Sequence, residues 1–165
     1  MAVIPVDELK KYITCELGMD DKQYQINGID LRVHKIYKFV SFSSFFSDEV
    51  KLPSLEEVKI ESLEGREVFV LDKGAYLIEF FETIEVPNNA VGICFPRSSL
   101  LRSGCDLRTA LWDSGYKGKS RALLVVYNPI IIEKGSRVAQ IIFIRTEKSV
   151  ERSYSGQYQL EGIKK

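Results

Sequence analysis

Alternating hydrophobic and polar residues recur along most of this chain and predict short β-strands. Ile29, Leu31 and Val33 alternate with Asp30 and Arg32. Successive side chains of a strand point to opposite faces, so we expect the apolar trio inward. Asp30 is then expected outward, on a solvated face, with Arg32 as a weak partner. The other predicted strands cover residues 35–40, 67–71, 76–84, 90–95, 107–112, 121–127 and 137–144.

Helical periodicity is confined to the N-terminal region. Val6, Leu9, Ile13 and Leu17 recur on one helical face, and Gly18 offers a C-terminal stop, so the pattern predicts one helix over residues 6–17. Many short strands separated by turn residues, together with a single helix, predict a mainly β fold, either an antiparallel sandwich or a barrel.

Two segments do not follow this alternation. Residues 41–62 are rich in Phe, Ser and Glu, and we expect Phe42, Phe45 and Phe46 to pack in the core rather than at a subunit contact. Residues 149–165 lack apolar periodicity, so they form either a frayed tail or a flexible arm that orders over a ligand. The chain length favours a single domain over residues 1–165.

Composition narrows the class of protein. The 23 basic residues balance 23 acidic ones, so nothing favours a nucleic-acid partner, and any anion site must be a local cluster. Three cysteines without C-x-x-C spacing disfavour a disulfide framework and suit a reducing cytoplasm. No signal peptide is expected. No apolar run approaches the roughly 20 residues of a membrane span, so no membrane partner is expected.

The segment around Arg97, Ser98 and Ser99 has the chemistry of a phosphate-binding turn. The guanidinium offers a rigid fork of donors, the serines add hydroxyl and backbone N–H donors, and Arg102 adds a second cation. Whether Arg97 faces a ligand or a subunit contact stays open. Gln140 lies in an apolar strand, where its long amide must bind either loop backbone groups or a ligand.

A second segment combines a carboxylate with aromatic residues. Trp112 precedes Asp113, and Tyr116 follows in an Asp-Ser-Gly turn that would by itself explain the aspartate. A carboxylate beside an aromatic platform fits a nucleotide hydrolase when phosphate-binding groups are near. The only histidine, His34, is expected at the surface at a strand end, and G-x-S-x-G, P-loop and Rossmann motifs are absent from the sequence.

Four segments resemble, in this order, the motifs of the trimeric dUTPase and dCTP deaminase superfamily. They are residues 26–32 (INGIDLR), 96–100 (PRSSL), 111–118 (LWDSGYKG) and 135–140 (GSRVAQ). The resemblance implies a jelly-roll-like β fold and a homotrimer whose active sites are shared between subunits. It also implies that the substrate is a Mg²⁺-bound deoxynucleoside triphosphate.

The resemblance further implies roles for individual residues. Asp113 would orient the attacking water, and Asp30 would lie near the water shell of Mg²⁺. The residues implied to bind phosphates are Arg97, Ser98, Ser99, Arg102 and Gln140. Those implied to contact the nucleoside are Trp112, Tyr116, which would pack on the deoxyribose, and Gly118. The C-terminal lid would use Arg152, Tyr154 and Tyr158.

The superfamily contains two activities, and the sequence favours one. The deaminase branch needs a Glu to move protons at the cytosine ring, three residues before a motif Asn. The Asn corresponds to Asn128 of this chain, so the Glu position is occupied by Val125. Residues 117–128 contain no acid. The expected reaction is therefore hydrolysis of dUTP to dUMP and pyrophosphate, which would limit uracil entry into DNA. The chain looks most like the archaeal-type dUTPases, which combine this chemistry with a deaminase-like framework.

Three departures from the dUTPase pattern keep other functions open. Gly115 stands where dUTPases commonly have a second Asp, Ile29 stands where an aromatic residue is usual, and a clear fifth motif is absent from the C-terminal sequence. The alternatives are a dCTP deaminase, a bifunctional deaminase and dUTPase, and a non-catalytic nucleotide-binding module.

Overall fold

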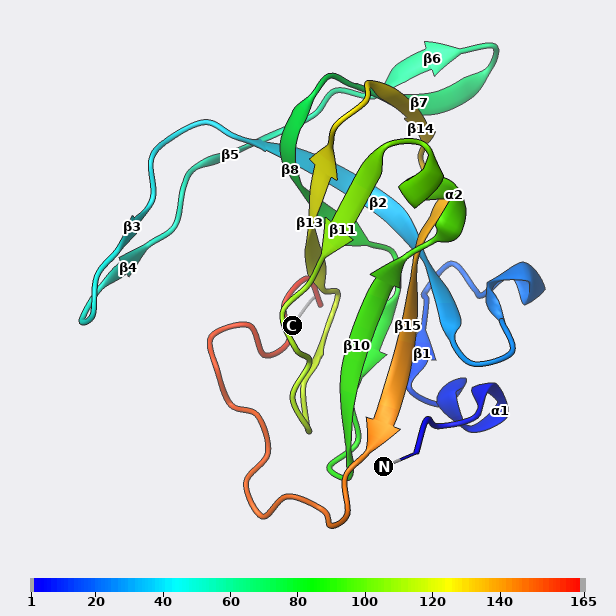
Figure 1. The fold of residues 1–165 in the computed structure, drawn as a ribbon, viewed down its shortest axis with the longest axis vertical. Helices are drawn as coiled ribbons and strands as arrows, with labels where there is room; N and C mark the ends of the chain where they lie inside the picture. Colours follow the sequence, from blue (N-terminus) through cyan, green and yellow to red (C-terminus); the bar gives the residue numbers. More distant parts are fainter. Residues whose placement is uncertain (1, 164–165) are drawn as a thin grey trace.

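The computed structural model describes residues 2–163 and is mainly β, with 46% strand and 7% helix (Figure 1). The helices are α1 (Val6–Leu9), the 3₁₀ turn η1 (Asp21–Gln23) and α2 (Ser98–Arg102). The strands are β1 (Ile13–Thr14), β2 (Ile29–Phe39), β3 (Ser44–Phe45), β4 (Val50–Lys51), β5 (Leu55–Glu57), β6 (Glu61–Leu63), β7 (Arg66–Leu71), β8 (Gly74–Phe80), β9 (Thr83–Glu85), β10 (Ala90–Pro96), β11 (Cys105–Arg108), β12 (Lys117–Gly118), β13 (Arg121–Val126), β14 (Ile130–Glu133) and β15 (Arg137–Arg145).

A seven-stranded sheet forms the body, in the order β10-β15-β2-β8-β13-β11, with β5 also paired to β2. A backbone bridge joins Gly92 of β10 to Trp112, just after β11, so the two edges of the sheet meet and the barrel is nearly closed. Smaller sheets, β1-β9-β12 and β14-β7-β6, flank it. The predicted mainly β barrel is confirmed.

Strand alternation builds the core. In β13, Ala122, Leu124 and Val126 are buried while the residues between them are half-buried. Phe80 and Phe143 are fully buried inside the barrel. This alternation fixes strand register, because a slip by one residue would turn every apolar side chain outward. The motif segments are therefore held at defined positions.

The predicted helix over residues 6–17 is wrong beyond its first turn. Helix α1 ends at Leu9, and Ile13 pairs with Ile84 in the small sheet. Ile13 is buried in this strand, whereas Leu17 is 77% exposed, so the apolar residues do not share one helical face. The run of Ile13 and Thr14 favours an extended backbone because both residues are β-branched.

Other element boundaries also differ from the prediction. The expected strand 76–84 is interrupted between β8 and β9, where buried Glu82 accepts hydrogen bonds from Gln23 and from Arg32. Strand β14 and helix α2 were not predicted. His34 was expected at a strand end, but it lies within β2, half-buried, with its ring 4.3 Å from that of Phe81.

The segment between β2 and β5 contradicts the expected core packing. Phe42, Phe45 and Phe46 are 98%, 87% and 63% exposed. They lie on a hairpin, β3–β4, that projects away from the barrel (Figure 1). Apolar content alone could not separate core from projecting surface here.

Within residues 2–163, no helix has the length and apolar character needed to cross a membrane. All three cysteines are free, and Cys94 and Cys105 are buried while Cys15 is half-buried. Burial raises the pKa of Cys94 to about 12 and also raises that of Cys105.

We expect only Cys15 to react quickly with a thiol reagent at pH 8 in the native protein, because the reactive species is the thiolate. A time course with Ellman's reagent checks this, and all three thiols should react once the chain is unfolded in guanidinium. Cys15→Ser should abolish the fast phase. Rapid native modification of Cys94 would contradict the described burial.

Candidate active site

The turn that follows β11 presents Asp113 to solvent. The Asp113 carbonyl accepts the Tyr116 N–H at 3.1 Å, and Gly115 adopts φ +86°, which the third residue of such a turn requires. The Ser114 hydroxyl donates to the Ala90 carbonyl at 2.6 Å and fixes the turn to β10. Asp113 is exposed, and its carboxylate makes no hydrogen bond to the described residues. An unpaired carboxylate on a fixed turn can bind a water.

The aromatic neighbours of Asp113 are buried and held in place. The Trp112 indole N–H donates to the Ser120 hydroxyl at 2.6 Å. Tyr116 packs over Gly118, where any Cβ would lie 2.6 Å from the Tyr116 hydroxyl oxygen, so this position has to be glycine. Burial raises the pKa of Tyr116 to about 12, and the ring stays a neutral phenol at physiological pH.

The C-terminal segment is seated on this turn. Tyr154 N–H donates to the Ser114 carbonyl at 2.9 Å, and the Gln159 side chain bonds both Gly115 O and Lys117 N–H at 2.9 Å. The Tyr154 ring meets that of Tyr116 edge-on at 5.7 Å. The C-terminal segment therefore packs on its own chain through these contacts.

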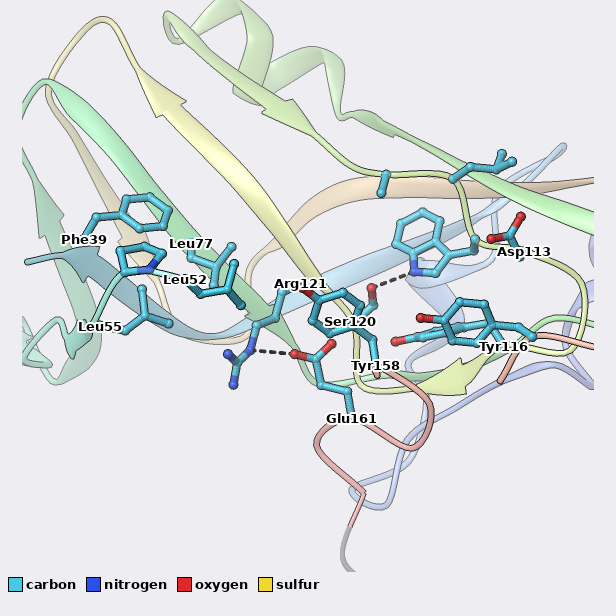
Figure 2. A pocket seen from close by; sticks show the side chains of 15 residues that line it. Phe39, Leu52, Leu55, Leu77, Asp113, Tyr116, Ser120, Arg121, Tyr158 and Glu161 are labelled. Atoms are coloured by element: carbon cyan, nitrogen blue, oxygen red, sulfur yellow. Dashed lines mark hydrogen bonds and ion pairs between the residues drawn. The ribbon is translucent and has the colours of Figure 1, made fainter. Parts of the chain in front are cut away.

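Asp113, its aromatic neighbours and part of the C-terminal segment line a cleft of about 390 Å³ (Figure 2). Asp113 and Tyr116 lie at one end, and the other end is apolar, with Phe39, Leu52 and Leu55. The structure thus brings together five predicted site residues, namely Trp112, Asp113, Tyr116, Tyr154 and Tyr158. Arg152, the third predicted lid residue, is exposed and does not line the cleft.

Sequence reasoning missed three polar groups of the cleft. Ser120, Arg121 and Glu161 lie between its two ends (Figure 2). Arg121 Nε is 3.4 Å from a Glu161 oxygen, and its guanidinium also binds Glu79 at 3.0 Å. Burial raises the pKa of Glu161, and the positive charge of Arg121 partly offsets this rise. Arg121 and Ser120 follow closely on the third motif, but no local signal marks Glu161.

The predicted phosphate-binding residues lie elsewhere, around Asp30. Asp30 is 1% exposed, so the expected solvated position is wrong, and Arg32 binds Glu82 instead at 2.7 Å. One Asp30 carboxylate oxygen is 3.0 Å from Arg97 Nε and 3.1 Å from Arg137 Nη1. Burial raises the pKa of Asp30, and the two guanidiniums partly offset this. The carboxylate orients both arginines.

These arginines border a shallow depression that also includes Ser99. Ser98, Ser99 and Arg102 are exposed on helix α2, which follows directly after Arg97. Gln140 of β15 lies opposite Asp30 on one side and Phe95 on the other. Among the described residues, none lines both this depression and the Asp113 cleft. The two predicted halves of the site are therefore separate within one chain.

The residues present do not form a protein cage for a metal ion. Within residues 2–163, no group of three or more carboxylate, histidine or cysteine side chains converges on one point. Mg²⁺ binds readily through substrate phosphates and retained waters, and it needs no such cage. The donor set fits an ion that arrives with a triphosphate.

A family model described as dCTP deaminase-like matches residues 6–146. The chain belongs to the dCTP deaminase-like family. Within this family, the chain is 40% identical over 149 residues to a probable deoxyuridine 5'-triphosphate nucleotidohydrolase of Aeropyrum pernix, an alignment that covers 88% of this chain and 91% of that protein. It is 39% identical over 143 residues to the deoxyuridine 5'-triphosphate nucleotidohydrolase of Methanocaldococcus jannaschii. That alignment covers 86% of this chain and 90% of that protein.

A solved dCTP deaminase from Agrobacterium tumefaciens shares the fold, with a TM-score of 0.64 at 19% identity, and 86% of this chain and 47% of that chain are covered. The chain thus spans about half the length of that structure. The segment from Lys117 to Asn128 contributes no acid to the cleft. The carboxylates that line it are Asp113 and Glu161.

Proposed function

We propose that this protein hydrolyses dUTP to dUMP and pyrophosphate. The observation that carries the proposal is Asp113, an exposed, unpaired carboxylate at one end of an aromatic cleft. Relatives that align over most of the chain bear the name of this activity. Deamination has less support, since the strand after the third motif supplies no acid to move protons at a cytosine ring.

In the proposed mechanism Asp113 accepts a hydrogen bond from a water and aligns it with the α-phosphorus. The water oxygen forms a bond to that phosphorus, the bond to the bridging oxygen of the β-phosphate breaks, and pyrophosphate leaves. The proton of the water passes to Asp113 and then to solvent. Tyr116, a neutral ring packed over Gly118, would bind the deoxyribose and exclude a 2′-hydroxyl.

The triphosphate would be held by Arg97, Ser98, Ser99, Arg102 and Gln140. The separation of their depression from the Asp113 cleft supports a site completed by a second copy of the chain. The outer face of β10 offers apolar surface for association: Phe95 is 54% exposed, and Val91 and Ile93 are half-buried. We propose a homotrimer with its active sites between subunits.

Mg²⁺ would neutralise charge on the triphosphate and the departing pyrophosphate. Protein groups need only position that complex, and Asp30 would act near it through water while holding Arg97. Tyr154, Tyr158 and Arg152 would cover the bound nucleotide.

Product analysis tests this function. Purified protein with Mg²⁺ is incubated separately with dUTP, dCTP, dTTP and UTP, and the products are resolved by ion-exchange chromatography. We expect dUMP and pyrophosphate from dUTP alone. Release of dUTP or dUMP from dCTP would instead establish a deaminase, and Glu161 would then be the first carboxylate to substitute.

A non-catalytic nucleotide-binding module predicts no product from any nucleotide. It still predicts thermal stabilisation by dUTP and Mg²⁺, since a ligand that binds only the folded state raises Tm. Turnover of dUTP would exclude this alternative.

A further inference from the structure

The projecting hairpin carries the largest concentration of exposed apolar residues on the described chain. Its members are Val40, Phe42, Phe45, Phe46, Val50 and Leu52, all at least 49% exposed. The hairpin is a separate two-stranded sheet, with only two cross-strand pairs, Ser44 with Lys51 and Phe45 with Val50. A two-stranded hairpin is marginally stable by itself in water, so this one needs a surface to pack on.

The base of the hairpin lies at the Asp113 cleft. Phe39 and Leu52 line the apolar end of that cleft (Figure 2), and Pro53 also lines the cleft. From there the hairpin leads away from its own barrel (Figure 1). The two sides of the hairpin, residues 40–46 and 47–53, are each long enough for an extended reach of roughly 20 Å. A partner that covers the apolar end of the cleft from outside would therefore lie beside the hairpin.

The phosphate-binding face of the chain has a matching apolar border. The depression that contains Arg97 and Ser99 is also lined by Ile130 and Ile131 of β14. Ile131 is 53% exposed, and Leu101 on the outer side of α2 is 56% exposed. If the Arg97–Ser99 face of a second copy completes the Asp113 cleft, this border is the apolar surface that accompanies the phosphate-binding groups to that cleft.

We propose that the β3–β4 hairpin is an intersubunit arm, and that its Phe42, Phe45 and Phe46 pack on α2 and β14 of the copy that completes the cleft. The partner is thus a second copy of this chain, and this orientation rests on the proposed function. The acidic turn residues Asp48 and Glu49 complement the exposed Arg102 at the end of α2. The arm would hold the partner's phosphate-binding groups over Asp113.

The first experiment measures the association of subunits. Phe42→Ser, Phe45→Ser and Phe46→Ser are combined, and subunit dissociation is measured by sedimentation equilibrium. We expect the dissociation constant to rise by at least about tenfold, since buried aromatic residues dominate interfaces. A matched control combines Leu17→Ser, Leu63→Ser and Ile60→Ser, which are 77%, 45% and 39% exposed and lie outside both the hairpin and the α2–β14 surface. Unchanged association of the hairpin variant would overturn the proposal.

The second experiment locates the surface that the hairpin contacts. A photoreactive benzophenone residue replaces Phe45, the chain is mixed with ¹⁵N-labelled protein, and crosslinked peptides are identified by mass spectrometry. We expect crosslinks between labelled and unlabelled chains within residues 97–104 or 130–138. Crosslinks within one chain, crosslinks to another face, or a monomeric wild-type protein would overturn the proposal.

Parallel assays of the wild-type protein with dUTP keep this inference distinct from the proposed function. The expected crosslinks without formation of dUMP would contradict the proposed hydrolase activity and still support the intersubunit role of the hairpin. If the wild-type protein forms dUMP and the hairpin variant associates as tightly as the wild type, only the intersubunit role of the hairpin is contradicted.

Discussion

Replacing Asp113 by asparagine should lower kcat for dUTP by about three orders of magnitude while nucleotide binding is retained. Asparagine has the same shape, so the turn held by Tyr116 and Ser114 should persist. The amide cannot accept a proton from water, and the attack on the α-phosphorus loses its base. No buried partner of Asp113 is lost, because its carboxylate binds no described residue.

Two measurements check this result. Steady-state kinetics give kcat, and calorimetry with a non-hydrolysable dUTP analogue and Mg²⁺ gives the binding constant. Asp72→Asn, in the exposed turn before β8, is the matched control and should leave kcat unchanged. Normal turnover by Asp113→Asn would remove the assigned role, and loss of analogue binding would mean that the residue holds substrate rather than water.

The strands of the barrel could be predicted from alternation because burial on one face leaves a period of two in the sequence. β13 and β15 were found in this way. The N-terminal helix was overestimated because a spacing of three and four residues also fits a turn followed by a short strand, as Ile13 shows. The hairpin residues Phe42, Phe45 and Phe46 were misplaced because hydrophobicity does not specify which surface covers a side chain.

The candidate site was predictable where the chemistry is local. Trp112, Asp113 and Tyr116 form one turn, and the structure keeps them in one cleft. Asp30 was misjudged because alternation assumes one covered face, whereas Arg97 and Arg137 cover the other. Glu161 enters the cleft only through the path of the C-terminal arm, which no periodicity encodes.

Mixing two inactive variants should restore dUTP hydrolysis if each site takes Asp113 from one subunit and the phosphate-binding serines from another. Asp113→Asn lacks the base, and the double variant Ser98→Ala with Ser99→Ala lacks hydroxyls on the exposed turn of α2. In a trimer that contains both variants, one of the three interfaces combines an intact Asp113 with intact serines, so we expect up to about one third of wild-type activity from the purified mixed oligomers.

The measurement uses co-expression of differently tagged variants, tandem purification of mixed oligomers and a pyrophosphate-release assay. Each variant alone, purified in the same way, provides the baseline. A mixture of the serine variant with a chain that carries both sets of substitutions is the matched control, because none of its interfaces contains intact Ser98 and Ser99. Recovery in the first mixture alone would place the two halves of the site on different subunits. Persistent inactivity of mixed oligomers would mean that the Asp113 cleft and the Arg97–Ser99 depression act within one chain, and that the chain must rearrange to bring them together.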